Sequence, residues 1–311
     1  MQRLTVLASW VVVGVFCLAA AGTVQAKTKA WNVPGDFATI QEAIDSDDVL
    51  DGDTIRVKKG SRAGAEVTKS VNIVGVGNPV IDSGPMHPAG LSMGFQLLAG
   101  SDGTTISHLS FAVDLAIMNG AAVNYVTVEH CSFDNTIQAV SNWRGSGWDI
   151  SHNVITDLRT RNGGGIGILV ADFSGGVVED NIVSHNKISG TLHVDPADGG
   201  GYAGTGIVLY ADFRWGGAGA SAITNNAIVM NDVSLVSDTP AVVDVVGIEL
   251  TDTRDDGTLK PVVYDNWIGY NDLRGTEDQI GITPPELELV NDIFRNLGEN
   301  RGHGMFSANA W

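Results

Sequence analysis

Three aspartates end similar apolar segments at regular intervals along the chain. Asp172, Asp212 and Asp252 follow one another at a spacing of 40 residues. If the three carboxylates stack, they repel one another, so a cation must bind, one must stay protonated, or turn amides must donate to them. Carboxylates about 5 Å apart can act as acid and nucleophile on a glycosidic bond, and inversion needs a wider gap. The alternative is a polar turn ladder that Asn119 and Asn142 begin at the equivalent place.

Aromatic and basic side chains lie near these aspartates in the sequence. Aromatic faces pack on the C–H surfaces of sugars, and guanidinium forks bind carboxylates. The sequence therefore predicts a substrate-binding edge beside the aspartates. The alternative is that the arginines only neutralise the aspartates while the aromatic rings cover the sheet. The side chains are Trp143, Arg144, Phe173, Tyr210, Phe213, Arg214, Trp215 and Arg254.

A repeated six-residue phrase indicates which elements position these side chains. Its third position advances by 22, 22, 33, 40 and 40 residues. Repeats with a short period and variable insertions are typical of solenoids, in which each unit buries its apolar face against its neighbours. Glycine-rich insertions at 162–165, 198–204 and 214–219 are expected to form walls along one side. The third positions are His108, His130, His152, His185, Asn225 and Asp265.

Polar residues of the phrase are expected to stack in columns. The asparagines that follow the third position are predicted to form one hydrogen-bonded ladder at a tight turn. The histidines are predicted to form a side-chain ladder, because neighbouring parallel strands lie about 4.8 Å apart. Two imidazoles at that distance can also ligate zinc or copper, which leaves metal handling as an alternative. The asparagines are Asn153, Asn186, Asn226 and Asn266, and the histidines are His108, His130, His152 and His185.

The chain is acidic, with 36 acidic residues, 18 basic residues and a formal net charge of −18. This balance argues against nucleic acids and anionic membrane surfaces as partners. It also opposes the binding of a polyanionic sugar unless a divalent cation such as calcium takes part. Cys131 is the only cysteine beyond the N-terminal segment, so no intrachain disulfide is expected and its thiol is predicted to be buried and inert.

The first 26 residues have the features of a secretory signal peptide. Arg3 gives a positive start, the run from Leu4 to Gly22 is nearly all apolar, and Ala26 ends a stretch of small residues. We expect cleavage after Ala26 and a secreted or periplasmic protein, with an uncleaved membrane anchor as the alternative. No later run has the apolar length that spans a bilayer. Residues 27–311 are expected to form one domain and to be monomeric.

The segment that follows combines a turn, a helix and the first strands. Within Val33–Ile44, Asp36 is predicted to cap an amphipathic helix, and Asp51–Val57 begins the strands. This opening and the repeated phrase resemble the pectin-lyase-like superfamily over roughly residues 31–300. The resemblance implies an all-β fold, a right-handed parallel β-helix of three sheets with a short N-terminal capping helix. The catalytic signatures of polygalacturonases, pectate lyases and alginate epimerases are not present as sets, so the resemblance transfers no catalytic residue.

The leading hypothesis is a secreted protein that acts on an extracellular polysaccharide in a groove along the three aspartates. In a glycoside hydrolase, Asp212 would be the acid, with Asp172 or Asp252 as its partner. In a polysaccharide lyase, Arg214 or Arg254 would be the base, and calcium on the aspartates would neutralise the substrate carboxylate. The alternatives are a non-catalytic β-helix that binds glycan or serves as a surface scaffold, and a periplasmic metal-handling protein.

Overall fold

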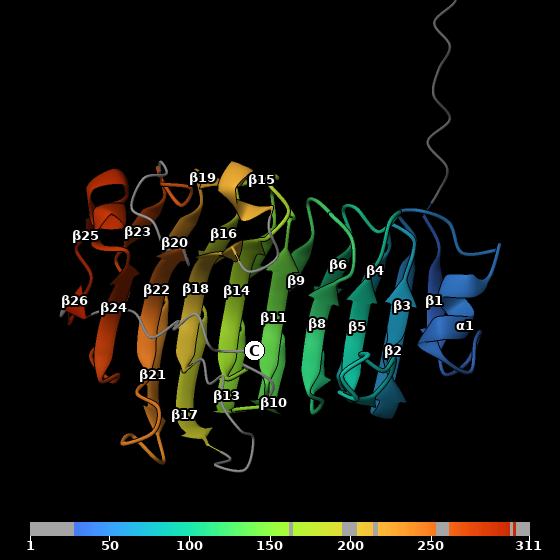
Figure 1. Ribbon diagram of the computed structural model, residues 1–311. Coiled ribbons are helices and arrows are strands. Elements are labelled where there is room, and N and C mark those ends of the chain that lie inside the picture. Colours follow the sequence, from blue (N-terminus) through green and yellow to red (C-terminus); the bar gives the residue numbers. More distant parts are fainter. Residues whose placement is uncertain are drawn as a thin grey trace, which may run out of the picture.

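Successive coils of the chain stack into a right-handed parallel β-helix (Figure 1). The computed structural model describes residues 28–161, 164–194, 204–213, 217–252, 261–298 and 301–302, the last two by their backbone alone. Every pairing between the named strands is parallel. The coils over residues 115–159 contribute one strand to each of three sheets, and the next two coils each add a short fourth strand, β15 (Val177–Glu179) and β19 (Ala222–Thr224), which pair with each other.

The first sheet contains the segments that end in the three aspartates. Its order is β3 (Ala65–Val67), β5 (Met93–Leu97), β8 (Leu115–Asn119), β11 (Gln138–Trp143), β14 (Ile166–Asp172), β18 (Thr205–Ala211), β22 (Val246–Asp252), β24 (Asp278–Thr283) and β26 (Arg301–Gly302).

The second and third sheets meet at a tight turn within each coil. The second sheet contains β6 (Thr105–Ser107), β9 (Thr127–Glu129), β12 (Asp149–Ser151), β16 (Ile182–Ser184), β20 (Ala227–Val229), β23 (Trp267–Gly269) and β25 (Asp292–Phe294). The third contains β7 (Ser110–Phe111), β10 (Ser132–Thr136), β13 (Val154–Arg159), β17 (Lys187–His193) and β21 (Asp232–Ser237). The long strand β4 (Asn72–Ser83) pairs with both β6 and β7 and so joins the two sheets.

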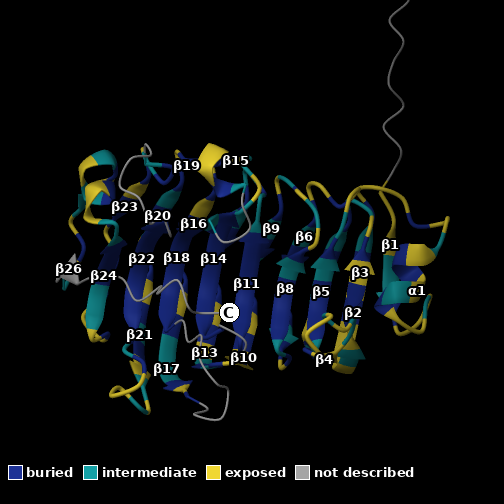
Figure 2. Cartoon of the chain, in the orientation of Figure 1, coloured by how far each residue is buried: buried dark blue, intermediate teal, exposed yellow. Residues whose placement is uncertain are grey.

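The core lies inside the coils and consists of columns of aliphatic and aromatic side chains. One column on the first sheet joins seven buried residues in register. On the third sheet, the rings of Phe111 and Phe133 stack with centroids 5.0 Å apart. Figure 2 shows the strands of the middle coils as mostly buried. The column consists of Phe95, Ile117, Val140, Ile168, Ile207, Ile248 and Ile280.

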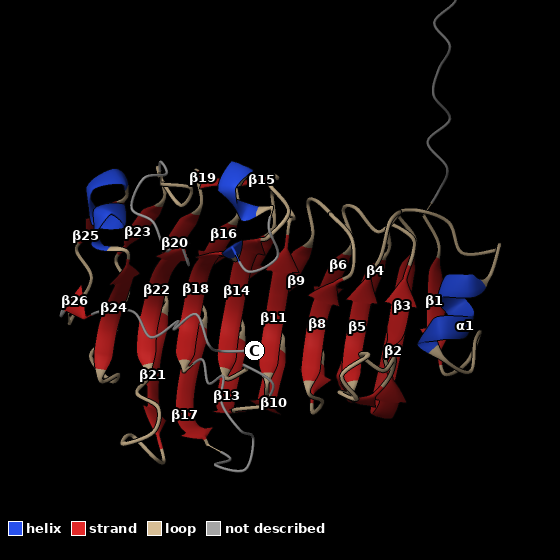
Figure 3. Ribbon diagram, viewed as in Figure 1, coloured by secondary structure: helices blue, strands red, loops and turns tan. Residues whose placement is uncertain are grey.

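A short helix closes the N-terminal end of the stack, next to β1 (Ala30–Val33) and β2 (Thr54–Ala63) (Figure 3). The helix α1 (Ile40–Asp45) begins after Thr39, whose side-chain oxygen accepts a hydrogen bond from the Glu42 N–H at 3.1 Å. The prediction that Asp36 caps this helix is wrong, because its carboxylate accepts hydrogen bonds from Asn32. Among the described residues, none of the helices is long and apolar enough to cross a membrane.

The repeated phrase occurs at two different turns of the coil. Ile182 pairs with Ala227 and Ser184 with Val229, so Met230, not Asn225, continues the histidine column. The expectation that all six copies of the phrase mark the same turn of successive coils is therefore wrong for the copies at Asn225 and Asp265. Both turns place a non-glycine residue in the left-handed region, with φ of 55° at His185 and at Asn225, which explains why their sequences look alike.

The asparagines accordingly form two ladders, not the single ladder that the spacing predicts. In each ladder, the side-chain amide donates to the next side-chain oxygen at 2.8–3.0 Å, and that oxygen also accepts a backbone N–H. The hydrogen-bonded stacking itself is confirmed. One ladder is Asn153, Asn186, Asn231, Asn271 and Asn296, and the other is Asn181, Asn226, Asn266 and Asn291.

Cys131 occupies the position that precedes the first asparagine of the longer ladder. Its N–H donates to Asn153 Oδ1 at 3.0 Å, and its side chain is buried. Burial raises the pKa of the thiol to about 12. The prediction of a buried, inert cysteine is confirmed, because a protonated thiol is a poor nucleophile.

Candidate functional site

The outer face of the first sheet carries a second apolar cluster, separate from the core inside the coils. Ile168 and Val170 pack in the interior, whereas Leu169 and Ala171 pack on the other side with Tyr210. This alternation follows from the two-residue period of a strand. The outer cluster consists of Ile166, Leu169, Ala171, Val208 and Tyr210, with Trp143 packed against it.

Four of the predicted substrate-binding residues come together at this face. Trp143 lies between two rings from later coils, with its centroid 5.5 Å from Phe173 and 6.3 Å from Tyr210. The Arg144 guanidinium lies 5.0 Å from the centroid of the Phe173 ring, within the range of a cation–π interaction. Tyr210 is buried, whereas Trp143, Arg144 and Phe173 are half-buried. The grouping is therefore confirmed, and the role in substrate binding stays a prediction.

Arg144 has an unusual backbone conformation and an unusual environment. Its φ is 69°, in the left-handed region that a bulky side chain rarely adopts, and its N–H donates to Ala171 O at 2.7 Å. Within the described part of the chain, its buried Nε has no hydrogen-bond partner. Backbone conformations of this kind often occur where a side chain is held for function. Arg144 as a whole is half-buried, so part of its side chain faces the surface beside Phe173, where a ligand can approach it.

Asp172 is committed to a turn. Its Oδ2 accepts hydrogen bonds from the N–H groups of Ser174, Gly175 and Gly176 and from the Ser221 hydroxyl, and its Oδ1 accepts from the Ser174 hydroxyl. Burial has the largest single effect and would raise the pKa of Asp172, but the hydrogen bonds together outweigh it and hold that pKa below its usual range. The Asp172 carboxylate is thus an ionised acceptor that stabilises the loop after β14.

The three aspartates do not form one row, and that prediction is wrong. Asp172 pairs with Ala211, and Ala211 pairs with Asp252, so Asp212 lies one residue beyond the row. Two strand spacings separate Asp172 from Asp252, roughly 10 Å. Asn142 pairs with Val170, two residues before Asp172, so Asn142 does not begin a row that continues to Asp172; its side-chain amide instead donates to Asn181 Oδ1 at 3.1 Å, at the start of the second asparagine ladder. Residues that pair between these strands are first 39 and then 41 positions apart in the sequence, whereas the aspartates are always 40 apart. Asp212 is therefore shifted by one residue relative to Asp172 and Asp252.

The described residues do not fit a calcium site built on Asp172. Both of its oxygens already accept hydrogen bonds from the loop, so a cation would have to displace several donors. In the described ranges, no group of three or more His, Cys, Asp or Glu side chains could hold a metal ion. No step of a mechanism is therefore assigned to calcium.

Some of the remaining predicted site residues are described by the structure, and the others are not. Phe213 is half-buried and packs against the interior core. Asp212 and Asp252 are buried at the ends of their segments. The predicted base candidates Arg214 and Arg254, the aromatic residue Trp215 and the predicted signal peptide over residues 1–26 lie outside the described residues.

A buried glutamate on the outer face was missed in the sequence. Glu249 stands in register with Val208, which itself pairs with Leu169, and its side chain accepts a hydrogen bond from the Thr205 hydroxyl at 3.1 Å. Its exposed fraction is 0%. The signal was available, because an acid replaces an aliphatic residue at the same place in the third of three similar segments.

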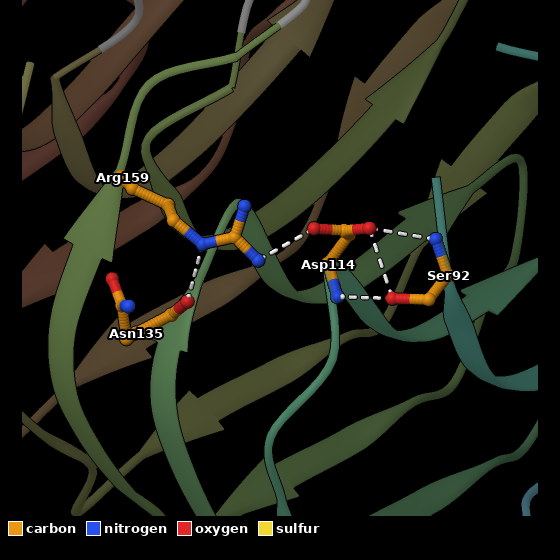
Figure 4. Close-up of polar contacts among 4 residues, drawn as sticks. All are labelled: Ser92, Asp114, Asn135 and Arg159. Carbon is orange, nitrogen blue, oxygen red and sulfur yellow. Dashed lines mark hydrogen bonds and ion pairs between the residues drawn. The ribbon is translucent and has the colours of Figure 1, made fainter. Parts of the chain in front are cut away.

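A polar cluster ties the other ends of the strands together (Figure 4). Asp114 accepts hydrogen bonds from the N–H and the hydroxyl of Ser92 and forms an ion pair with Arg159 at 2.5 Å. The Arg159 Nε donates to Asn135 O at 2.8 Å. Burial would raise the pKa of Asp114, but Ser92 and Arg159 outweigh it and lower that pKa. These groups bind one another across four coils, so we assign them to the stability of the stack.

The four histidines form an exposed column, as predicted. Their ring centroids are 5.2, 5.2 and 4.8 Å apart, and the rings of His152 and His185 are nearly parallel, at 3°. Imidazole lone pairs lie in the ring plane, so two parallel rings cannot direct them at one ion with good geometry. Metal handling stays a hypothesis, and equilibrium dialysis that retains no zinc or copper would remove it.

No protein-family model matches the chain, and no curated protein matches it by sequence. Among solved structures, the chain is similar to an alginate lyase from Paenibacillus sp. str. FPU-7, with 15% identity and a TM-score of 0.39 over 88% of this chain and 98% of that one. It is also similar to the catalytic domain of a GH87 α-1,3-glucanase in complex with tetrasaccharides, with 15% identity and a TM-score of 0.32 over 91% and 69%. These similarities concern the fold in outline. The parallel sheets and internal asparagine ladders of the chain itself identify it as a right-handed parallel β-helix.

Proposed function

We propose that this β-helix is a secreted protein that acts on an extracellular polysaccharide bound across the outer face of the first sheet. The observation that carries the proposal is the convergence of Trp143, Arg144 and Phe173 from two successive coils, with Tyr210 of the next coil behind them. Half-buried aromatic faces accept the C–H surfaces of pyranose rings, and the Arg144 guanidinium can bind a sugar hydroxyl or carboxylate.

Asp212 is the carboxylate best placed to serve this face. Val208 and Tyr210 pack on the outer side, whereas Ala211 packs in the interior. By the same alternation, Asp212 belongs to the outer side, and Asp252, which follows the interior residue Leu250, belongs to the inner side. We therefore propose Asp212 as the group that transfers a proton during cleavage.

The experiment is a degradation screen of the purified protein on uronans and neutral glycans, with and without calcium. We expect wild-type protein to shorten at least one of them, and Asp212→Asn to lower turnover by about 100-fold or more. The melting temperature of Asp212→Asn serves as the control for folding. A wild-type protein that cleaves no member of the panel contradicts a catalytic function.

A non-catalytic glycan-binding β-helix is the second candidate, and the arrangement of the carboxylates favours it. Asp172 is committed to its turn, and Glu249 lies four residues before Asp212 along the paired strands, about 13 Å away at 3.3 Å per residue. Both known hydrolase geometries need carboxylates closer than about 10 Å. Under this alternative, Asp212→Asn leaves glycan binding unchanged and no variant has any turnover to lose.

A further inference from the structure

The second sheet carries an exposed aromatic group that the proposed site does not use. Trp267 of β23 has an exposed fraction of 55%, and Tyr270 in the turn after β23 has 46%. Phe294 of β25 lies beside both, with its ring centroid 5.6 Å from that of Trp267 and 5.2 Å from that of Tyr270. Three aromatic rings on two neighbouring coils thus share one outer surface.

Neighbouring contacts fix the rings in place. Phe294 covers Gly269, where a Cβ atom would come within 2.5 Å of the ring, so the glycine lets Phe294 lie against the strand. Arg295 lies over the Tyr270 ring at 5.7 Å, and its Nη1 donates to the Tyr270 hydroxyl at 3.0 Å. The indole of Trp267 therefore packs against Phe294, which is itself held in place. This contact reduces the entropic cost of ordering the indole when a ligand binds.

A groove runs beside Trp267. A depression of about 220 Å³ is lined by Trp267, Ala227, Asn225, Asp265 and Asp292, among others. A larger depression of about 720 Å³ adjoins it and shares Asp265. Ala227 pairs with Trp267 in register, and its small side chain leaves the floor of the groove open next to the indole. The larger depression is lined by Gly219, Ala220, Ser221, Ala222, Pro261, Val262, Tyr264, Asp265 and Val290.

The polar groups along this groove select the charge of a ligand. Asp265 and Asp292 are exposed carboxylates, and Asn225 is an exposed amide. Among the described residues, neither depression is lined by a lysine or an arginine, and the whole chain has a net charge of −18. Carboxylates accept hydrogen bonds from hydroxyl groups and repel a uronate.

We propose that this groove on the second sheet is a binding site for an uncharged polysaccharide. A pyranose ring stacks its C–H face on the Trp267 indole above Ala227, and its hydroxyls donate to Asp265 and Asp292. The larger depression holds the sugars that continue the chain. The site lies on a different sheet from the proposed site at Trp143 and Arg144, so it does not depend on that function.

Affinity electrophoresis tests the proposal, in native gels that contain laminarin, xylan, galactomannan or sodium polygalacturonate. We expect at least one of the three neutral polymers to retard wild-type protein, and Trp267→Ala to weaken that binding about tenfold or more. Ala227→Leu, which fills the floor and keeps all three rings, should weaken it similarly. Asp265→Asn keeps the left-handed turn but removes the charge, and should weaken it less.

Two matched controls show whether binding depends on this groove in particular. Tyr125→Ala removes an even more exposed aromatic residue from an earlier coil and should leave retardation unchanged. Val154→Ala, which trims an exposed apolar side chain on the third sheet away from both proposed sites, should also leave it unchanged. The proposal is overturned if no neutral polymer retards the protein, if only polygalacturonate does, or if folded Trp267→Ala and Ala227→Leu bind as wild type does.

Discussion

At the scale of single residues, Asp172 has a structural role, although its place in the 40-residue repeat of aspartates suggested a catalytic one. Five hydrogen bonds hold its carboxylate in the loop after β14, and they outweigh the effect of burial on its pKa. Arg144 is the opposite case, because its buried Nε has no partner within the described residues and its backbone is held at φ 69°. Asp172 is fully buried and only the half-buried Arg144 reaches the surface, so Arg144 is the one of the two that a ligand can contact.

The hydrogen bonds of Asp172 predict the pH dependence of stability. Because its pKa is lower in the folded state, its contribution is complete above the unfolded value of about 3.9 and is lost as pH falls through the lower, folded value. Asp172→Asn should therefore destabilise the protein at neutral pH by about 2–3 kcal/mol, since the loop N–H groups lose a charged acceptor. The difference between wild type and variant should shrink below about pH 4.

Urea unfolding of both proteins from pH 3 to pH 8 measures this difference. Asp134→Asn, an exposed aspartate on β10, is the matched control and should lie within about 0.5 kcal/mol of wild type throughout. A difference between wild type and Asp172→Asn that stays constant with pH would show that the carboxylate charge has no part in holding the loop.

At the scale of elements, the internal ladders determine how coils align. Asn186 makes four side-chain hydrogen bonds: it accepts from the N–H and the side-chain amide of Asn153, and it donates to Asn231 and to Ile150 O. Each ladder residue thus satisfies backbone groups that the tight turns leave without partners in the sheet. A hydrogen-bonded column therefore sets the register that the sheets follow.

Replacing a ladder residue should destabilise the stack. Asn186→Ala leaves several buried polar groups without partners and is expected to lower the free energy of unfolding by about 3–4 kcal/mol. Lys187→Ala, at the exposed neighbouring position, should change it by less than about 0.5 kcal/mol. Chemical denaturation followed by circular dichroism measures both, and equal effects of the two substitutions would refute the role of the ladder.

The sequence predicts the solenoid well and its register poorly. The phrase around His108, His130 and His152 recurs every 22 residues, and short periods of this kind identify stacked coils. Later coils contain insertions, and both turns of a coil use an apolar residue, a left-handed residue and an asparagine. A pattern search therefore cannot tell the turn at Asn225 from the turn at His185, and an error of one turn misplaces every later column.

The sequence predicted those parts of the candidate site that depend only on contacts between neighbouring strands, and not those that depend on the exact register of later coils. Trp143, Phe173 and Tyr210 meet because each lies at or next to the end of a strand of the first sheet in adjacent coils. The exclusion of Asp212 from the row depends on a shift of one residue in the register, which the 40-residue spacing hides. The cluster at Trp267 and Phe294 was missed because it depends on the same register.

At the scale of the whole molecule, the stack presents different chemistry on different faces. The first sheet offers a half-buried aromatic cluster with an arginine, and the second offers exposed rings with carboxylates. Because a solenoid repeats its scaffold along one axis, a long linear polymer can contact several coils at once. This geometry is the basis of our proposal that an extended polysaccharide binds to one or both faces.

Side-by-side glycan arrays of wild-type protein and Trp143→Ala test the central claim most directly, with Trp267→Ala as the control on the other face. We predict that wild type binds at least one polysaccharide whose signal falls about tenfold or more in Trp143→Ala and persists in Trp267→Ala. Circular dichroism confirms that both variants are folded. The account is contradicted if wild type binds no glycan, or if folded Trp143→Ala keeps every signal of the wild type.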